Sequence, residues 1–102
     1  MGPSSPVAGG GGPAILDIGD HVGALVLYAP EALLGHEVEL APEVEPTRRV
    51  HTVVREWRIG SRRQFPAVFP SLGAGRYRIC ARGGAASVTI TGGAVTEADW
   101  PG

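Results

Sequence analysis

Short apolar or alternating runs, separated by glycine and proline, fill this chain from residue 14 onward. The run HEVELA (36–41) alternates strictly, which puts Val38 and Leu40 on one side of a strand and Glu37 and Glu39 on the other. Bounded runs of this kind are typical of β-strands, and no apolar repeat of helical period extends beyond one turn at 30–34. The pattern predicts strands at 14–18, 22–29, 36–41, 48–59, 64–69, 76–82, 87–91 and 94–100.

Seven or eight short strands in 102 residues predict one all-β domain, a single antiparallel β-sandwich with Greek-key, immunoglobulin-like connections. The Gly- and Pro-rich residues 1–13 are expected to form a flexible tail, and residues 14–102 the domain. The almost wholly apolar VGALVLYA (22–29) predicts a central strand covered on both faces. Pro66 predicts an edge strand or a bulge, and turns are expected at 60–63, 83–86 and 92–93.

The stretch VFPSLGAGRYRI (68–79) places Leu72, Gly75 and Tyr77 at the spacing L-x-x-G-x-Y. This is the spacing of a tyrosine corner, in which the hydroxyl bonds back to the backbone a few residues upstream and fixes a crossover between sheets. Glycine supplies a backbone conformation that other residues resist. We therefore predict a structural role, with Leu72 and Tyr77 buried and Gly75 at the bend.

The stretch AVFPSLGAGRYRI, followed by ASVTITGGAVTEADW, resembles the C-terminal half of prealbumin-like and carboxypeptidase-regulatory-like modules, and LLGHEVEL resembles their earlier strand. This resemblance covers roughly residues 33–100 and implies a prealbumin-like sandwich. The pieces LDIG, GALV, LLGHEVE, RRVHTVV and ITGGAVTEADW also resemble short actinobacterial proteins of uncertain role, some of them labelled phospholipase. That second resemblance would imply a hydrolase.

Hydrolase chemistry requires an activated nucleophile or a metal-bound water. The chain has no G-x-S-x-G motif, and HEVEL (36–40) has Leu40 where a zinc protease requires its second histidine. We therefore expect a protein that is not an enzyme and has no cofactor. His36, His51 and Cys80 form an alternative metal set if paired strands bring them together, but each histidine can equally be an ordinary surface or core-edge residue.

Charge is divided along the chain although the net charge is only −1. Residues 1–47 carry seven acids and no arginine, whereas residues 48–82 carry all nine arginines and one acid, Glu56. Cross-strand Glu–Arg pairing and a basic face that meets an acidic partner both explain this division. Arginine and tryptophan are common interface anchors, so the candidate binding residues are Arg55, Trp57, Arg58, Arg62 and Arg63; the alternative is a solvated hairpin with Trp57 in the core.

The near-neutral charge gives no argument for binding nucleic acid or an anionic membrane, and no apolar run has the length of a transmembrane helix. A single cysteine excludes an intramolecular disulfide and fits a reducing compartment. We therefore predict a cytoplasmic, non-catalytic binding or assembly module that self-associates or docks on a protein partner. The open edges of a sandwich, the apolar run 22–29 and the opposed charges motivate this prediction. A small metal- or ligand-binding protein and a hydrolase are the alternatives.

Overall fold

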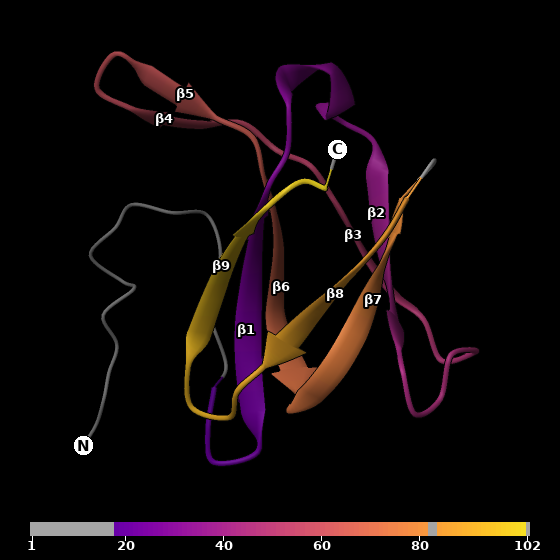
Figure 1. The fold of residues 1–102 in the computed structure, drawn as a ribbon. Helices are drawn as coiled ribbons and strands as arrows, with labels where there is room; N and C mark the ends of the chain where they lie inside the picture. Colours follow the sequence, from indigo (N-terminus) through magenta and orange to yellow (C-terminus); the bar gives the residue numbers. More distant parts are fainter. Residues whose placement is uncertain (1–17, 82–83, 102) are drawn as a thin grey trace.

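The structure of the protein is a computed structural model that describes residues 18–81 and 84–101. The predicted all-β fold is confirmed, and one 3-10 turn, η2 (Glu31–Leu33), follows the first strand (Figure 1). The strands are β1 (Val22–Tyr28), β2 (Glu37–Pro42), β3 (Val50–Val53), β4 (Trp57–Ile59), β5 (Arg62–Gln64), β6 (Pro66–Gly73), β7 (Gly75–Ala81), β8 (Gly84–Ile90) and β9 (Val95–Asp99). The expected tail, 1–13, and residues 14–17 of the first expected strand lie outside the described residues.

The strands form a three-stranded sheet in the order β6-β1-β9 and a four-stranded sheet in the order β3-β2-β7-β8. The hairpin of β4 and β5 belongs to neither sheet and projects from one end (Figure 1). Strand pairs are antiparallel with one exception: β9 runs parallel to β1, with Ala24 opposite Val95 and Tyr28 opposite Asp99. The exception arises because the Gly92–Gly93 turn carries the chain from β8 into the other sheet, where it joins β1 in the same direction.

The core lies between the two sheets. Leu25 and Phe69 of the three-stranded sheet pack in one cluster with Leu40, Ile79 and Ile90 of the four-stranded sheet. Strand β1 is buried on both faces, since five consecutive residues, 23–27, are buried. This confirms the prediction for VGALVLYA, and it means that most of the apolar run is buried in the interior of the fold.

The tyrosine corner is confirmed. The Tyr77 hydroxyl donates a hydrogen bond to the Gly73 carbonyl oxygen at 2.7 Å, four residues upstream. Leu72 and Tyr77 are buried, and Gly75 has a φ of 145°, which side chains other than hydrogen disfavour. The corner joins β6 of one sheet to β7 of the other.

Several expected boundaries are wrong. The strand expected at 64–69 begins in β5, which includes Gln64, and β6 extends to Gly73. The run 48–59, predicted as one strand, is divided into β3 and β4 because the chain leaves the sheet after Val53: the Val54 side chain is buried, and Arg55 N–H donates to the Pro66 carbonyl at 3.0 Å. Residue 83 of the turn expected at 83–86 lies outside the described residues, and residues 84–86 belong to β8 instead. Pro66, in contrast, does begin an edge strand, as predicted.

Within the described residues, no helix is long and apolar enough to cross a membrane.

Candidate functional site

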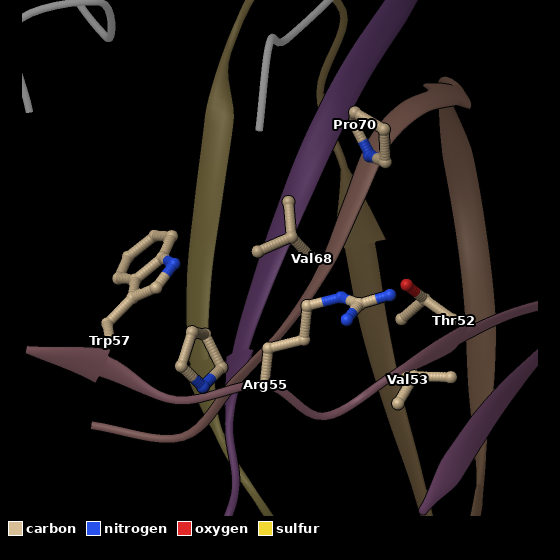
Figure 2. A pocket seen from close by; sticks show the side chains of 7 residues that line it. Thr52, Val53, Arg55, Trp57, Val68 and Pro70 are labelled. Carbon is tan, nitrogen blue, oxygen red and sulfur yellow. The ribbon is translucent and has the colours of Figure 1, made fainter. Parts of the chain in front are cut away.

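An apolar groove lies where the edge strands β3 and β6 run beside each other. We call it the β3–β6 groove. Its volume is about 190 Å³, and its lining residues are Thr52, Val53, Arg55, Trp57, Pro66, Val68 and Pro70. Figure 2 shows Trp57 at one end and Thr52 and Val53 at the other, with the Arg55 side chain between them.

The bend after β3 builds this groove. Val54 is anchored in the core, with its N–H bonded to the His36 carbonyl at 3.0 Å, so the chain turns there toward β6. The backbone bond from Arg55 to Pro66 then fixes the two edges against each other. On β6, residues 66, 68 and 70 alternate with the core residues 67 and 69, so Pro66, Val68 and Pro70 share the side that faces the groove.

Trp57 is half-buried, and its indole Nε1 is shielded from solvent without a hydrogen-bond acceptor among the described residues. A buried N–H group without a partner costs about 1–3 kcal/mol, and tryptophan in a folded protein usually finds one. The ring is therefore neither a fully packed core residue nor a fully solvated one. It lies at the junction between the sandwich and the projecting hairpin.

Charge pairing on the hairpin divides the predicted arginines into two groups. Arg58 and Arg63 each donate from Nε to a Glu56 carboxylate oxygen at 3.1 Å, and Arg63 Nη2 also reaches Glu31 at 3.2 Å. The hydrogen bonds to Glu56 lower the pKa of its carboxyl below the usual value, and the bond from Arg63 contributes more than the bond from Arg58. The Arg63 guanidinium also lies 5.1 Å from the ring centroid of Phe65, a cation–π contact. Arg58 and Arg63 thus mainly hold the hairpin together.

Arg55 and Arg62 are both exposed and form no ion pair within residues 18–81 and 84–101. Only Arg55 and Trp57 of the predicted binding residues line the groove, whereas Arg62 lies at the far end of the hairpin, opposite the exposed Ile59. The structure therefore narrows the predicted cluster to one cation and one indole.

Most of the described arginines outside the hairpin pair with acids of the N-terminal half of the chain. This is the outcome expected if cross-strand Glu–Arg pairing explains the charge division. Arg49 meets Glu39 at 3.1 Å, and Arg76 meets Glu43 at 3.5 Å. These pairs border a second, more polar hollow of about 310 Å³ on the outer side of the four-stranded sheet, lined by Ala41, Pro42, Glu43, Pro46, Arg49, Arg78 and Cys80. The opposed charges are therefore largely satisfied within the chain.

The alternative metal residues do not come together. His36 and His51 are exposed, although His36 shares its parity with the buried Val38 and Leu40. The reason is local: His36 precedes β2 and follows Gly35, which has a φ of 86° and resets the alternation. On β3 the even-numbered positions face the core. Cys80 is half-buried, and the described residues contain no group of three His, Cys, Asp or Glu side chains able to hold a metal ion.

In the partial zinc-protease motif HEVEL, residues 37–40 lie in β2, where Leu40 is fully buried in the core and Glu37 is exposed. On a strand, successive side chains alternate between faces instead of converging as they do one turn apart on a helix.

No family model, curated protein or solved structure matches this chain. Function therefore has to be inferred from the geometry of the surface.

Five groove residues were missed from the sequence: Thr52, Val53, Pro66, Val68 and Pro70. The alternation Pro-x-Val-x-Pro in residues 66–70 was the available signal, because it places two prolines and an apolar side chain on one side of a strand. Its partner residues on β3 could not be identified, since the contact between β3 and β6 joins two different sheets.

Proposed function

We propose that the protein is a non-catalytic binding module whose β3–β6 groove docks an extended segment of a protein partner. The observation that carries this proposal is the chemistry gathered in the groove: apolar walls, an indole N–H without an acceptor, and the Arg55 guanidinium without an ion pair in the described part of the chain. Each of these features is incomplete in the isolated chain. A single extended segment can complete all of them.

The size of the groove favours side chains over a small-molecule ligand. Pockets for small molecules usually measure about 300–1,000 Å³, and the groove holds about 190 Å³. That volume suits one or two apolar side chains. Tryptophan and arginine, which flank it, are the residues most enriched among binding hot spots.

The expected partner segment carries an acidic residue beside an apolar one. The acidic side chain would pair with Arg55, and a backbone carbonyl would accept from Trp57 Nε1 after a small rotation of the ring, since the nitrogen is shielded from solvent. The prealbumin-like resemblance and the cytoplasmic location stay predictions.

The test is selection of peptides from a random displayed library on the immobilised full chain, followed by titration of synthetic binders. Trp100 is replaced by Phe, so that the fluorescence of Trp57 alone reports on the groove; these are the two tryptophans of the chain. We expect selected peptides to combine an acidic and an apolar residue and to shift the Trp57 emission. Arg55→Glu should weaken their binding by about tenfold or more, because one charge-assisted contact becomes a repulsion.

Arg78→Glu is the matched control, since Arg78 is also exposed and lies on the outer face of the four-stranded sheet, away from the groove. It should leave binding within about twofold of the wild type, because exposed charges far from a site are screened. Peptides that bind Arg55→Glu as well as the wild type, or a library that yields no saturable binder, would show that the groove is not a docking site.

A further inference from the structure

The two sheets leave four edge strands, β6, β9, β3 and β8. An edge strand presents unpaired N–H and C=O groups that can pair with another chain. Proteins usually protect such edges with proline, with charged residues, or by keeping the strand short. The four edges of this sandwich differ in these respects.

Prolines protect the edge of β6. The Pro66 carbonyl accepts a hydrogen bond from the Arg55 N–H, so the backbone groups of Pro66 and of the alternate residues that follow it face away from β1. Those residues are Val68 and Pro70. Among these outward positions, none of which lies beyond the register shift of the β1–β6 pair, Pro66 and Pro70 have no N–H group to offer, so the ladder that a further strand would need is interrupted.

Charge protects the edge of β9. Trp100 N–H donates to the Tyr28 carbonyl and Ala24 N–H to the Ala94 carbonyl, so even-numbered positions face β1. The odd-numbered positions, which include Glu97 and Asp99, face away. Strand β3 has only four residues, and the chain after it is already bonded to β6.

Strand β8 has none of these protections. Its seven residues, GAASVTI, contain neither proline nor a charged side chain. The bond from Glu43 N–H to the Arg76 carbonyl shows that the even-numbered positions of β7 face β2, so its odd-numbered positions face β8. In register, Tyr77 lies opposite Val88 and Ile79 opposite Ala86.

It follows that residues 85, 87 and 89 present their N–H and C=O groups to the open side of β8. The side chains of Ser87 and Thr89 are exposed, and those of Ala86 and Val88, which point toward the core, are only half-buried. Within residues 18–81 and 84–101, the sandwich is thus incompletely closed along this edge. A strand added there would cover these inward side chains as well as pair the backbone.

We propose that β8 pairs antiparallel with β8 of a second copy of this chain, about a two-fold axis at Ser87. In this register Ser87 lies opposite Ser87 of the second copy and Ala86 opposite Val88. All seven residues of β8 then pair with residues of the second copy. Residues 85, 87 and 89, whose backbone groups face outward, lie opposite one another, and the side chains that point toward the core stay on one face of the joined sheet. The four-stranded sheets of the two copies become one continuous sheet.

The charge nearest to the two-fold axis is the Glu43 carboxylate, which contacts Ser87 Oγ at 2.9 Å. Its pairing with Arg76 at 3.5 Å offsets the repulsion between the two copies. The exposed arginines nearest to the junction, Arg76 and Arg78, lie on β7, one strand in from the edge. Across the junction they are separated from their equivalents by three strand spacings, roughly 14 Å, which exceeds the Debye length of about 8 Å at physiological salt. The proposal does not depend on the β3–β6 groove, because that groove lies at the opposite edges of the two sheets.

The first test is the mass of the full chain in sedimentation equilibrium from about 1 to about 100 µM, where a dimer must show concentration dependence. We expect a monomer–dimer equilibrium. Ser87→Lys should raise the dissociation constant by about tenfold or more, because two like charges meet at the axis. Lysine also suits the monomer, since Ser87 Oγ contacts the Glu43 carboxylate at 2.9 Å. Val95→Lys, the same change on the exposed edge of β9, should leave the dimer intact.

The second test reads the register directly, in a Cys80→Ser background. A hydrogen-bonded antiparallel pair places its Cα atoms about 5.5 Å apart, within the range of a disulfide. Ser87→Cys should therefore cross-link two copies on mild oxidation, and Thr89→Cys should not, since residue 89 lies opposite residue 85. A wild-type chain that is monomeric throughout, a dimer lost with Val95→Lys and kept with Ser87→Lys, or cross-linking at 89 and not at 87 would overturn the proposal.

Discussion

Replacing Tyr77 by Phe tests whether the corner between β6 and β7 is structural. The change removes one hydrogen bond, the 2.7 Å contact from the Tyr77 hydroxyl to the Gly73 carbonyl, and leaves the buried ring in place. Gly73 is exposed, so water can solvate its carbonyl afterwards and no buried acceptor is left unpaired. The expected loss is therefore the net value of one hydrogen bond, about 1 kcal/mol of unfolding free energy.

For a domain of this size, about 1 kcal/mol corresponds to a fall in melting temperature of roughly 4–8 °C. Urea denaturation followed by circular dichroism measures the same difference independently, with an unchanged slope against denaturant. Tyr28→Phe is the control. It also removes a tyrosine hydrogen bond, the 3.0 Å contact to Glu97, but in an exposed setting, so its effect should stay within about 0.5 kcal/mol.

If Tyr77→Phe is as stable as the wild type, or if Tyr28→Phe costs as much, the corner does not hold the crossover as we argue. Binding provides a second criterion. Peptides selected on the β3–β6 groove should bind the Tyr77→Phe variant with unchanged affinity, because Tyr77 does not line the groove. A loss of binding without a loss of stability would instead place a site at the corner.

Three further predictions concern backbone strain and ionisation. Gly75→Ala should lower the free energy of unfolding, measured by urea denaturation, by about 1–3 kcal/mol, because φ at Gly75 is 145°. A methyl group at Gly75 meets no atom within 4 Å, so the cost comes from the backbone alone. Gly19→Ala is the control, since the space around Gly19 is equally open, and it should change the stability little. By NMR titration, Glu56 should have a pKa below 4.5, and this pKa should rise toward 4.5 in Arg63→Gln. Because the pKa of Glu56 is lowered in the folded state, the stabilising contribution of its carboxylate is present above pH 4.5 and is lost as pH falls through the folded pKa. Burial raises the pKa of Tyr77 above 10.0, so its contribution is present below pH 10.0 and lost as pH rises through the folded pKa, and Tyr77→Phe should flatten the alkaline fall in stability.

The local sequence determined the strands and the corner of this protein. Alternation in HEVELA placed Val38 and Leu40 in the core because a strand repeats every two residues whatever its neighbours are. The corner was equally readable, since the hydrogen bond of Tyr77 spans only four residues and Gly75 lies between its partners. Features whose causes lie within a few residues were the ones that sequence could predict.

The tertiary structure alone decided which residues meet across the fold. The parallel pairing of β9 with β1, the exposure of His51, and the contact of Arg55 with Pro66 depend on pairings between distant segments. A shift of register by one residue exchanges the two faces of a strand, so local alternation cannot tell which parity of β3 faces inward. The charge halves likewise became intramolecular pairs only when β2 was placed beside β3 and β7. The groove at β6 and the unprotected edge at β8 exist for the same reason: they are defined by the strands that end up beside them, or by the absence of one.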